Sequence, residues 1–170
     1  IMGNPPFVGA RLMEQGSVQK REVQNIFGKI KDVQDLDYVT CWYKLAAEYI
    51  QNTKIQVCFV STNSICQGSQ VPILWNILYK NYRIHINFAY QTFKWSSEST
   101  NGAAVHCVII GFSSVGCKGK KYLFSNGIVK EVTNINPYLL ELPNFLISSR
   151  SEPICDVPEI LLGNMPNDNK

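Results

Sequence analysis

Several features that would assign this chain to a specialised class are missing from its sequence. No stretch approaches the roughly 18 consecutive apolar residues of a membrane-spanning helix. The chain opens on Ile-Met-Gly with no charged segment ahead of an apolar one, so no signal peptide is expected. Its 16 Lys and Arg against 13 Asp and Glu give a net charge of +3. This balance permits an anionic partner without requiring one.

The six cysteines include no Cys-x-x-Cys pair, the spacing that most often indicates a zinc or redox site. Four of them lie within or at the ends of apolar stretches, as buried thiols do in a reducing cytoplasm. His106 and Cys107 are neighbours, so on a strand they would point to opposite sides. We therefore expect free thiols, no metal site and a cytoplasmic location.

The most informative segment that is present is the tetrad Asn4-Pro5-Pro6-Phe7, directly after an apolar Ile-Met. An Asn-Pro-Pro-aromatic tetrad leaving a strand is typical of enzymes that methylate an amino nitrogen conjugated with a planar system. Such a nitrogen is a poor nucleophile because its lone pair is delocalised. Two hydrogen-bond acceptors aimed at its hydrogens, here the Asn4 side chain and the Pro5 carbonyl, can free that lone pair. The two prolines make the turn rigid, and Phe7 offers a face for base stacking.

Hydrophobic spacing and turn residues predict alternating helices and strands. Helices are expected at 17–29, 35–52 and 71–81, and strands at 55–61, 84–90 and 104–112, after a first strand that ends at Met2. Asp35 or Asp37 is the expected cap of the second helix. The loop before 104–112 is too short for a helical crossover, so that strand should run antiparallel to its neighbour. Asn126-Gly127 predicts a hairpin.

This order of elements predicts half of an open α/β sheet. Ligands bind such sheets beyond the carboxyl ends of the strands. Residues 4–7, 62–67 and 90–95 emerge at that edge, and we expect them to converge there.

Five runs resemble, in this order, segments of one enzyme family: GNPPFVG (3–9), LDYVTCWYKLAAEYI (36–50), FVSTNSICQGSQVPILW (59–75), FAYQTFKW (88–95) and AAVHCVIIGFS (103–113). The family is the DNA N6-adenine methyltransferases, and the similarity is greatest to the MmeI-like group, where methyltransferase and restriction activities share a polypeptide. The similarity continues to VPEILLGNMPND near the end of the chain. It implies the carboxyl-terminal half of a class I, Rossmann-like methyltransferase sheet, with S-adenosylmethionine as cofactor and double-stranded DNA as partner in a bacterial cytoplasm.

The resemblance also implies roles for individual residues. Asn4, Pro5 and Pro6 would hold the target amine, with Asn4 also beside the cofactor, and Phe7 would stack on a flipped adenine. The segment FAYQTFKW matches the second base-contacting loop of the family. Phe93 is therefore the candidate for the opposing base contact, with Lys94 nearby.

Parts of the family pattern lie outside this sequence. The acidic, glycine-rich loop that docks the methionine moiety would precede the tetrad, and a target-recognition domain would follow. We divide the chain into a catalytic half (1–116) and a hairpin with a connector towards the recognition domain (117–170). Alone, the chain is expected to bind cofactor weakly or not at all and to be inactive. An exposed sheet edge is also expected, and a second copy of the chain is a candidate to cover it.

Other interpretations stay open. The same tetrad would serve a glutamine side chain in a protein or an amine of an RNA base. A non-catalytic DNA-binding or assembly module that retains a methyltransferase half is a further alternative, although an intact tetrad argues against it. The structural alternatives are a turn-capping role for Asn4 and core packing for Phe93. The cluster Lys118, Lys120 and Lys121 is either a solvated turn or a phosphate contact.

Overall fold

A computed structural model of the protein describes residues 1–95, 105–116, 119–150 and 152–158. Its elements follow in the order β1 (Met2–Gly3), η1 (Ala10–Leu12), α1 (Val18–Phe27), η2 (Val33–Asp35), α2 (Thr40–Tyr49), β2 (Val57–Thr62), η3 (Asn63–Cys66), α3 (Gln70–Tyr82), β3 (His85–Trp95), β4 (Val105–Ser113), β5 (Lys121–Ser125) and β6 (Ile128–Val132). Lys118 and most of the segment VPEILLGNMPND lie outside the described residues.

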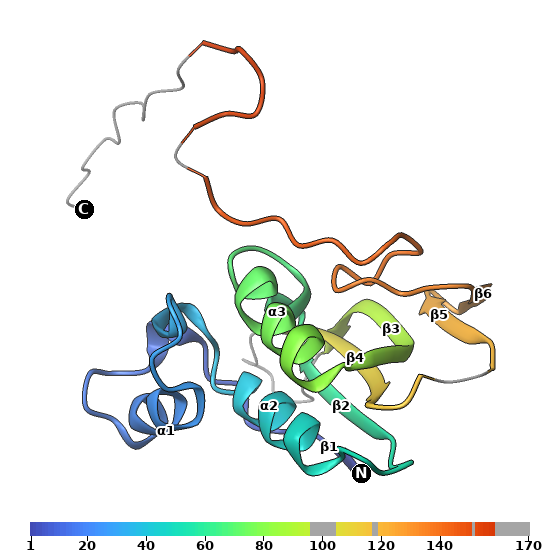
Figure 1. Ribbon diagram of the computed structural model, residues 1–170, viewed down its shortest axis with the longest axis horizontal. Coiled ribbons are helices and arrows are strands. Elements are labelled where there is room, and N and C mark those ends of the chain that lie inside the picture. Colours follow the sequence, from blue (N-terminus) through green and yellow to red (C-terminus); the bar gives the residue numbers. More distant parts are fainter. Residues whose placement is uncertain (96–104, 117–118, 151, 159–170) are drawn as a thin grey trace.

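The strands form one six-stranded sheet in the order β1-β2-β4-β3-β5-β6 (Figure 1). β1 is parallel to β2, and β3 is parallel to β5. β4 lies between β2 and β3 and is antiparallel to both, so the antiparallel pairing expected for 104–112 is confirmed. The chain order alone did not predict that this strand would separate two strands that run parallel to each other.

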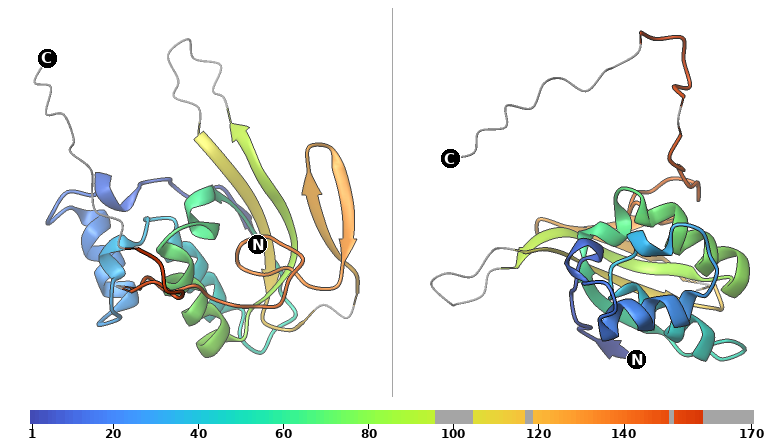
Figure 2. Two further views of the ribbon diagram at one scale, coloured as in Figure 1. Left: turned by 90° about the horizontal axis from the view of Figure 1, so that it is seen from above. Right: turned by 90° about the vertical axis from the view of Figure 1, so that its left-hand side faces the viewer.

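The core lies between the sheet and the helices α2 and α3, which sit together on one side of it (Figure 2). Tyr43 of α2 is fully buried, and its ring centroid lies 5.4 Å from those of both Phe59 in β2 and Phe112 in β4. Its hydroxyl shares a 2.7 Å hydrogen bond with Ser61. Alternation along β2 turns Phe59 and Ser61 towards these helices and leaves Thr62 half-buried on the opposite face.

Helix boundaries follow local signals in α1 but not in α2. Ser17 caps α1 by accepting a hydrogen bond from the Lys20 backbone, and Gly28 ends it at a φ of 64°. The expected start of the second helix at residue 35 is wrong, because α2 begins at Thr40 after the separate turn η2. Asp37 does not cap α2, since its carboxylate bonds to other parts of the chain.

The predicted hairpin is confirmed. Asn126 and Gly127 take φ values of 48° and 77°, the left-handed pair that a tight hairpin turn needs. Because β5 pairs with β3, the sheet continues beyond residue 116. The start of the segment read as a connector is packed as well: Leu139 is 2% exposed, and its carbonyl accepts a 2.7 Å hydrogen bond from Gln91. The division at residue 116 remains a prediction.

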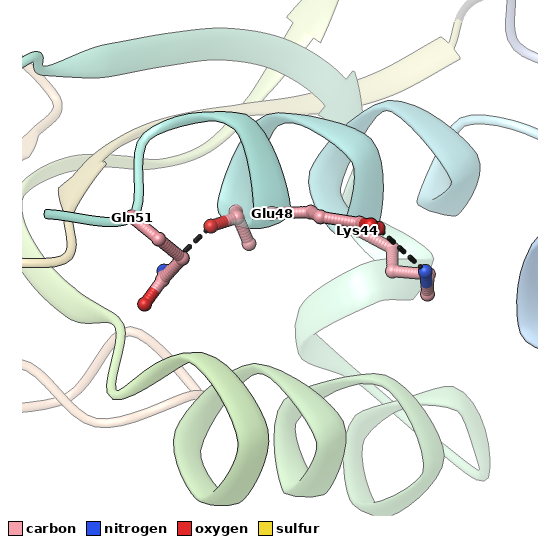
Figure 3. A network of polar contacts seen from close by, with 4 residues as sticks. Lys44, Glu48 and Gln51 are labelled. Carbon is pink, nitrogen blue, oxygen red and sulfur yellow. Dashed lines mark hydrogen bonds and ion pairs between the residues drawn. The ribbon is translucent and has the colours of Figure 1, made fainter.

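The side of α2 that faces the end of α3 carries a polar network (Figure 3). Lys44 forms a 2.9 Å ion pair with Glu48 one turn later. The Gln51 amide donates to the carbonyls of Ala47 and Tyr82, at 2.6 and 3.1 Å.

Within the described residues, none of the helices has the length and apolar character needed to cross a membrane.

The cysteines agree with the expected free thiols wherever the structure describes them. Cys41, Cys66 and Cys107 are buried and free, whereas Cys155 is exposed and free. Burial raises the pKa of Cys41 and of Cys66 to about 12. These two thiols therefore stay protonated near neutral pH.

Candidate active site

The tetrad forms the turn that follows β1. β1 is anchored because the Cys58 backbone donates a 2.8 Å hydrogen bond to the Ile1 carbonyl, and Gly3 pairs with Phe59. Pro5 is buried, whereas Asn4 and Pro6 are exposed. Among the described residues, neither the Asn4 carboxamide nor the Pro5 carbonyl has a hydrogen-bond partner. The turn therefore holds two acceptors that have no partner among the described residues, which is compatible with the acceptor pair expected from the sequence.

Phe7 is half-buried and packs against the hydrophobic core. Part of its ring is thus held by the fold, and only the remainder is open to a ligand. Packing on one side fixes the orientation of the ring before a ligand arrives.

The three segments expected at one edge of the sheet do lie at that edge. Residues 90–95, however, belong to β3, which extends to Trp95, so the loop expected after residue 90 is wrong. β4 is antiparallel to both β2 and β3, and β1 is parallel to β2, so the carboxyl ends of β1, β2 and β3 share an edge. Near this edge, Cys107 of β4 pairs with Thr62 on one side and with Phe93 on the other. Directly paired side chains share a face, so Thr62 and Phe93 lie on the same side, two strand spacings or about 10 Å apart.

Phe93 belongs to a row of aromatic rings on that face. Its ring lies edge-on to Tyr90 at a centroid distance of 5.4 Å and 6.3 Å from Trp95. Tyr90 is in turn stacked on Phe124 of β5 at 6.0 Å. A register shift between Tyr90 and Phe93 inserts an extra residue into β3, which keeps both rings on the same face.

Lys94 does not join Phe93. It is exposed, it is the next residue along β3, and it pairs with His106 instead of Cys107. Adjacent residues of a strand point to opposite faces. The structure therefore brings Thr62 and Phe93 to one face and places Lys94 on the other.

Asp37 connects the tetrad turn to the end of β2. It is 7% exposed, and one carboxylate oxygen accepts a 2.7 Å hydrogen bond from the Ala10 backbone. The other accepts a 2.5 Å bond from the Ser64 hydroxyl, which also lies 2.8 Å from the Thr62 hydroxyl. The backbone of Asp37 donates a 2.9 Å bond to the Gln70 side chain at the start of α3. Segments far apart in the sequence are thereby fixed around one carboxylate.

Tyr38 adds a second tie to the same turn. Its backbone donates a 2.9 Å hydrogen bond to the Val8 carbonyl, directly after the tetrad. Its hydroxyl donates to Glu22 of α1, and this bond to a carboxylate raises the pKa of Tyr38 to about 12. The tetrad turn is therefore held by α1 as well as by the segment that leads into α2.

Comparison with known proteins identifies the family. The model of the MmeI DNA-methyltransferase domain matches residues 1–125. The chain belongs to this family. It is 48% identical over 168 residues to DNA methyltransferase A of Bacillus subtilis (strain 168), covering 99% of the chain and 19% of that relative. It also matches the DNA-bound structure of the Type IIL restriction-modification enzyme MmeI, with a TM-score of 0.85 and 43% identity, covering 92% of the chain and 21% of that protein.

The MmeI family assignment confirms the expected α/β class with a Rossmann-like sheet. The chain spans about a fifth of the length of these two relatives. What the longer proteins do is therefore a matter of proposal for this chain.

The structure also shows what reasoning from the sequence missed. The sequence predicts Asp35 or Asp37 as a helix cap, because an acidic residue ahead of a helical pattern is typical of that role. In the structure Asp37 forms a bridge instead. Its use as a bridge depends on Ala10 and Ser64, each 27 residues away along the chain. Tyr90 was not singled out either, although the alternation of aromatic residues in FAYQTFKW is a signal that could have indicated it.

An open cavity of about 460 Å³ adjoins this bridge. Its lining includes Ala10, Asp37, Ser64 and Gln70, and no residue of the tetrad. It lies beside the structural support of the site and not at the two acceptors. In the part of the chain that the structure describes, no group of three or more His, Cys, Asp or Glu residues is placed to hold a metal ion.

Proposed function

We propose that the chain is the catalytic half of a site-specific adenine DNA methyltransferase within a restriction-modification enzyme of the MmeI type. The single observation that carries the proposal is the pair of unused acceptors, on the Asn4 carboxamide and the Pro5 carbonyl, at the carboxyl edge of the sheet. Membership in a DNA-methyltransferase family supports the same conclusion.

The two acceptors act on the exocyclic amine of adenine. Asn4 and Pro5 accept its two hydrogens, which draws the nitrogen towards tetrahedral geometry and makes its lone pair available. The amine then gains one methyl group and releases one proton. No covalent bond between enzyme and base is required. Pro6 contributes by restricting Pro5, so the carbonyl is aimed before the base arrives.

Use of S-adenosylmethionine is general among methyltransferases, and we propose it as the cofactor here. When bound, it supplies an electrophilic methyl group. The residues present fit the acceptor side of this reaction, because the unused polar groups of the tetrad are acceptors for an amine. Of these residues, Asn4 would lie nearest to the transferred methyl group. The proposal places the main cofactor-binding loop in a part of the protein that precedes the tetrad.

Double-stranded DNA is the proposed partner. Flipping a base out of the duplex costs a few kcal/mol, and stacking on an aromatic side chain returns about 1–3 kcal/mol. Phe7 is held on one side by the core, and Phe93 is buttressed by Tyr90, so both rings are fixed in orientation. We propose that Phe7 and Phe93 contact the flipped adenine. Lys94 lies on the opposite face of β3 from Phe93, and we propose that it contacts a DNA phosphate and not the base.

The test uses the full-length protein, labelled S-adenosylmethionine and unmethylated bacterial DNA, with the product nucleosides identified by mass spectrometry. We expect N6-methyladenine in the DNA. Asn4→Ala should lower turnover by two orders of magnitude or more, because one of two transition-state acceptors is lost. The affinity for DNA should change far less. Asn81→Ala is the matched control, since Asn81 is exposed near the end of α3, at the opposite edge of the sheet.

Near-normal turnover in Asn4→Ala would refute the role of Asn4. If the methyl group is transferred to RNA or to a glutamine side chain and none to DNA, the methyl acceptor is that amine and not adenine in DNA. If cofactor and DNA both bind and no acceptor is methylated, the chain is a binding or assembly module.

We also propose four further points. The catalytic half ends at residue 116, and residues 117–170 lead towards a recognition domain. A second copy of the chain covers an exposed edge of the sheet, where β1 and β6 are the terminal strands. The protein works in the bacterial cytoplasm, and the isolated chain is inactive. Sedimentation of the full-length protein would test the second copy.

A further inference from the structure

We propose that Asp37 is a positioning residue for methyl transfer, which sets the tetrad turn in register with the end of β2 and fixes the direction of the hydroxyl hydrogens there. This inference rests on the proposed function. Asp37 does not touch the reacting atoms in this account. It acts through Ala10, Ser64 and Thr62.

Asp37 first fixes the relative position of two segments of the site. Ala10 follows the tetrad closely, and Ser64 follows β2 by two residues. The two carboxylate oxygens of Asp37 accept from these two segments at 2.7 and 2.5 Å. One rigid group thus determines how far Asn4 stands from Thr62, the residue that shares a face with Phe93. A shift of about 1 Å in such an arrangement can cost a hundredfold in rate.

Asp37 also fixes which hydroxyl donates in each hydrogen bond at the end of β2. An ionised carboxylate only accepts hydrogen bonds, so the Ser64 hydroxyl must donate to Asp37. Ser64 therefore has lone pairs left for Thr62, and the Thr62 hydroxyl donates to Ser64 across 2.8 Å. With its hydrogen committed inward, Thr62 offers only lone pairs on its accessible side. The end of β2 is thereby an acceptor, like Asn4 and Pro5.

A carboxylate meets the requirements of this position better than an amide of the same shape. In the described part of the chain, no Lys or Arg forms an ion pair with Asp37, although it is 7% exposed. Burying a charge without a countercharge is costly, and its cost is offset here by hydrogen bonds to both oxygens. An amide of the same shape would avoid this cost but has one acceptor oxygen. The carboxylate is the group that accepts from both sides.

Asp37→Asn tests the direction of these hydrogen bonds with little change in volume. The amide oxygen can still accept from Ala10, whereas its nitrogen donates to Ser64 and reverses the two hydroxyls. In the full-length enzyme we expect kcat to fall about tenfold to a hundredfold. KM values for cofactor and DNA should stay within about threefold, and Tm should change little. Asp35→Asn is the matched control, since Asp35 is exposed in the preceding turn and should leave kcat unchanged.

A double-mutant cycle tests whether Asp37 acts through Ser64. Ser64→Ala should lower kcat by a similar factor, and the double variant should be no slower than the slower single variant, because both changes break one chain of contacts. A purely structural role would instead lower Tm and weaken cofactor binding together.

The outcomes separate this inference from the function on which it rests. If the wild-type enzyme methylates no acceptor, both proposals fall. If it is active and Asn4→Ala is impaired, but Asp37→Asn stays within twofold of wild type, only the role of Asp37 is refuted. The role of Asp37 would also be refuted if the effects of the two single variants on kcat multiplied in the double variant. A loss of kcat accompanied by an equal loss of cofactor affinity and a lower Tm would refute it as well.

Discussion

Two polar networks lie close to α2 and differ in almost every physical respect. Beside the end of α3, Lys44 and Glu48 pair within a single helix, and their side chains are 17% and 58% exposed (Figure 3). Ahead of the helix, Asp37 is 7% exposed and joins segments 27 residues away in both directions. The first network lies on a helix that is already held by its buried face. The second joins the segment after the tetrad to the segment after β2.

The difference shows why distance alone does not rank polar contacts. Both networks contain hydrogen bonds between 2.5 and 2.9 Å. Water competes for the exposed pair and salt screens it, so such pairs contribute about 0–1 kcal/mol. Around Asp37, the Ala10 and Ser64 donors are half-buried and border an open cavity, so water can replace a lost partner only in part. A removed group therefore leaves these donors poorly paired. The contribution of a hydrogen bond to stability therefore depends on whether water can replace the partner that is lost.

Removal of the Asp37 carboxylate should have the largest effect on stability. Asp37→Ala leaves the Ala10 amide and the Ser64 hydroxyl without their acceptor, so we expect a local loss of about 2–3 kcal/mol. Hydrogen exchange by mass spectrometry on the full-length protein should show faster exchange in peptides that cover Ala10 and Ser64. Asp35→Ala is the control and should change exchange by less than about 0.5 kcal/mol. Equal effects of the two variants would remove the distinction between buried and exposed carboxylates.

Gln70 gives an intermediate case that sharpens the comparison. It is 8% exposed, and its side chain accepts from the Asp37 backbone. Gln70→Met keeps the shape but leaves one neutral donor unpaired, so we expect a local loss of about 1–2 kcal/mol. The same exchange experiment should show faster exchange around Asp37 and little change in α1. A loss as large as that of Asp37→Ala would mean that charge has no special part in the network.

The smallest effect is expected at the surface pair. Lys44→Met should cost about 0.3–0.5 kcal/mol, and the cost should shrink at high salt. The hydrogen bond from Lys44 lowers the pKa of Glu48 from its ordinary value of 4.5. The contribution of the pair is therefore complete above that value and is lost as pH falls through the lowered pKa of the folded protein. Urea titrations of wild type and Lys44→Met at two pH values on either side would check this. A difference that grows at acid pH would contradict the assignment.

Elements defined by local signals could be predicted from the sequence, and long-range placement could not. The cap at Ser17 and the turn at Asn126-Gly127 are confirmed because each depends on residues that are neighbours in the chain. The insertion of β4 between β2 and β3 depends on which strands pair, and the chain order does not state this. The early start predicted for the second helix failed because a tertiary demand on Asp37 overrode its capping preference.

The candidate site divides in the same way. Asn4 and Pro5 could be proposed as acceptors because the tetrad is a local motif, and neither the Asn4 carboxamide nor the Pro5 carbonyl has a partner among the described residues. Phe93 could be proposed from its segment, but its alignment with Thr62 requires the register of three strands. The expectation that Lys94 lies beside Phe93 is wrong because β3 extends to Trp95, beyond the strand predicted at 84–90. Neighbouring residues of a strand point to opposite faces.

The extra residue between Tyr90 and Phe93 has a consequence for how this segment can change in length. Three steps along β3 correspond to two along β4. Deleting the exposed Thr92 would restore regular pairing, with Phe93 still opposite Cys107 and on the same face as Tyr90. A relative with one residue fewer here would keep the aromatic pair in place, so a gap in this stretch of an alignment is compatible with an unaltered site.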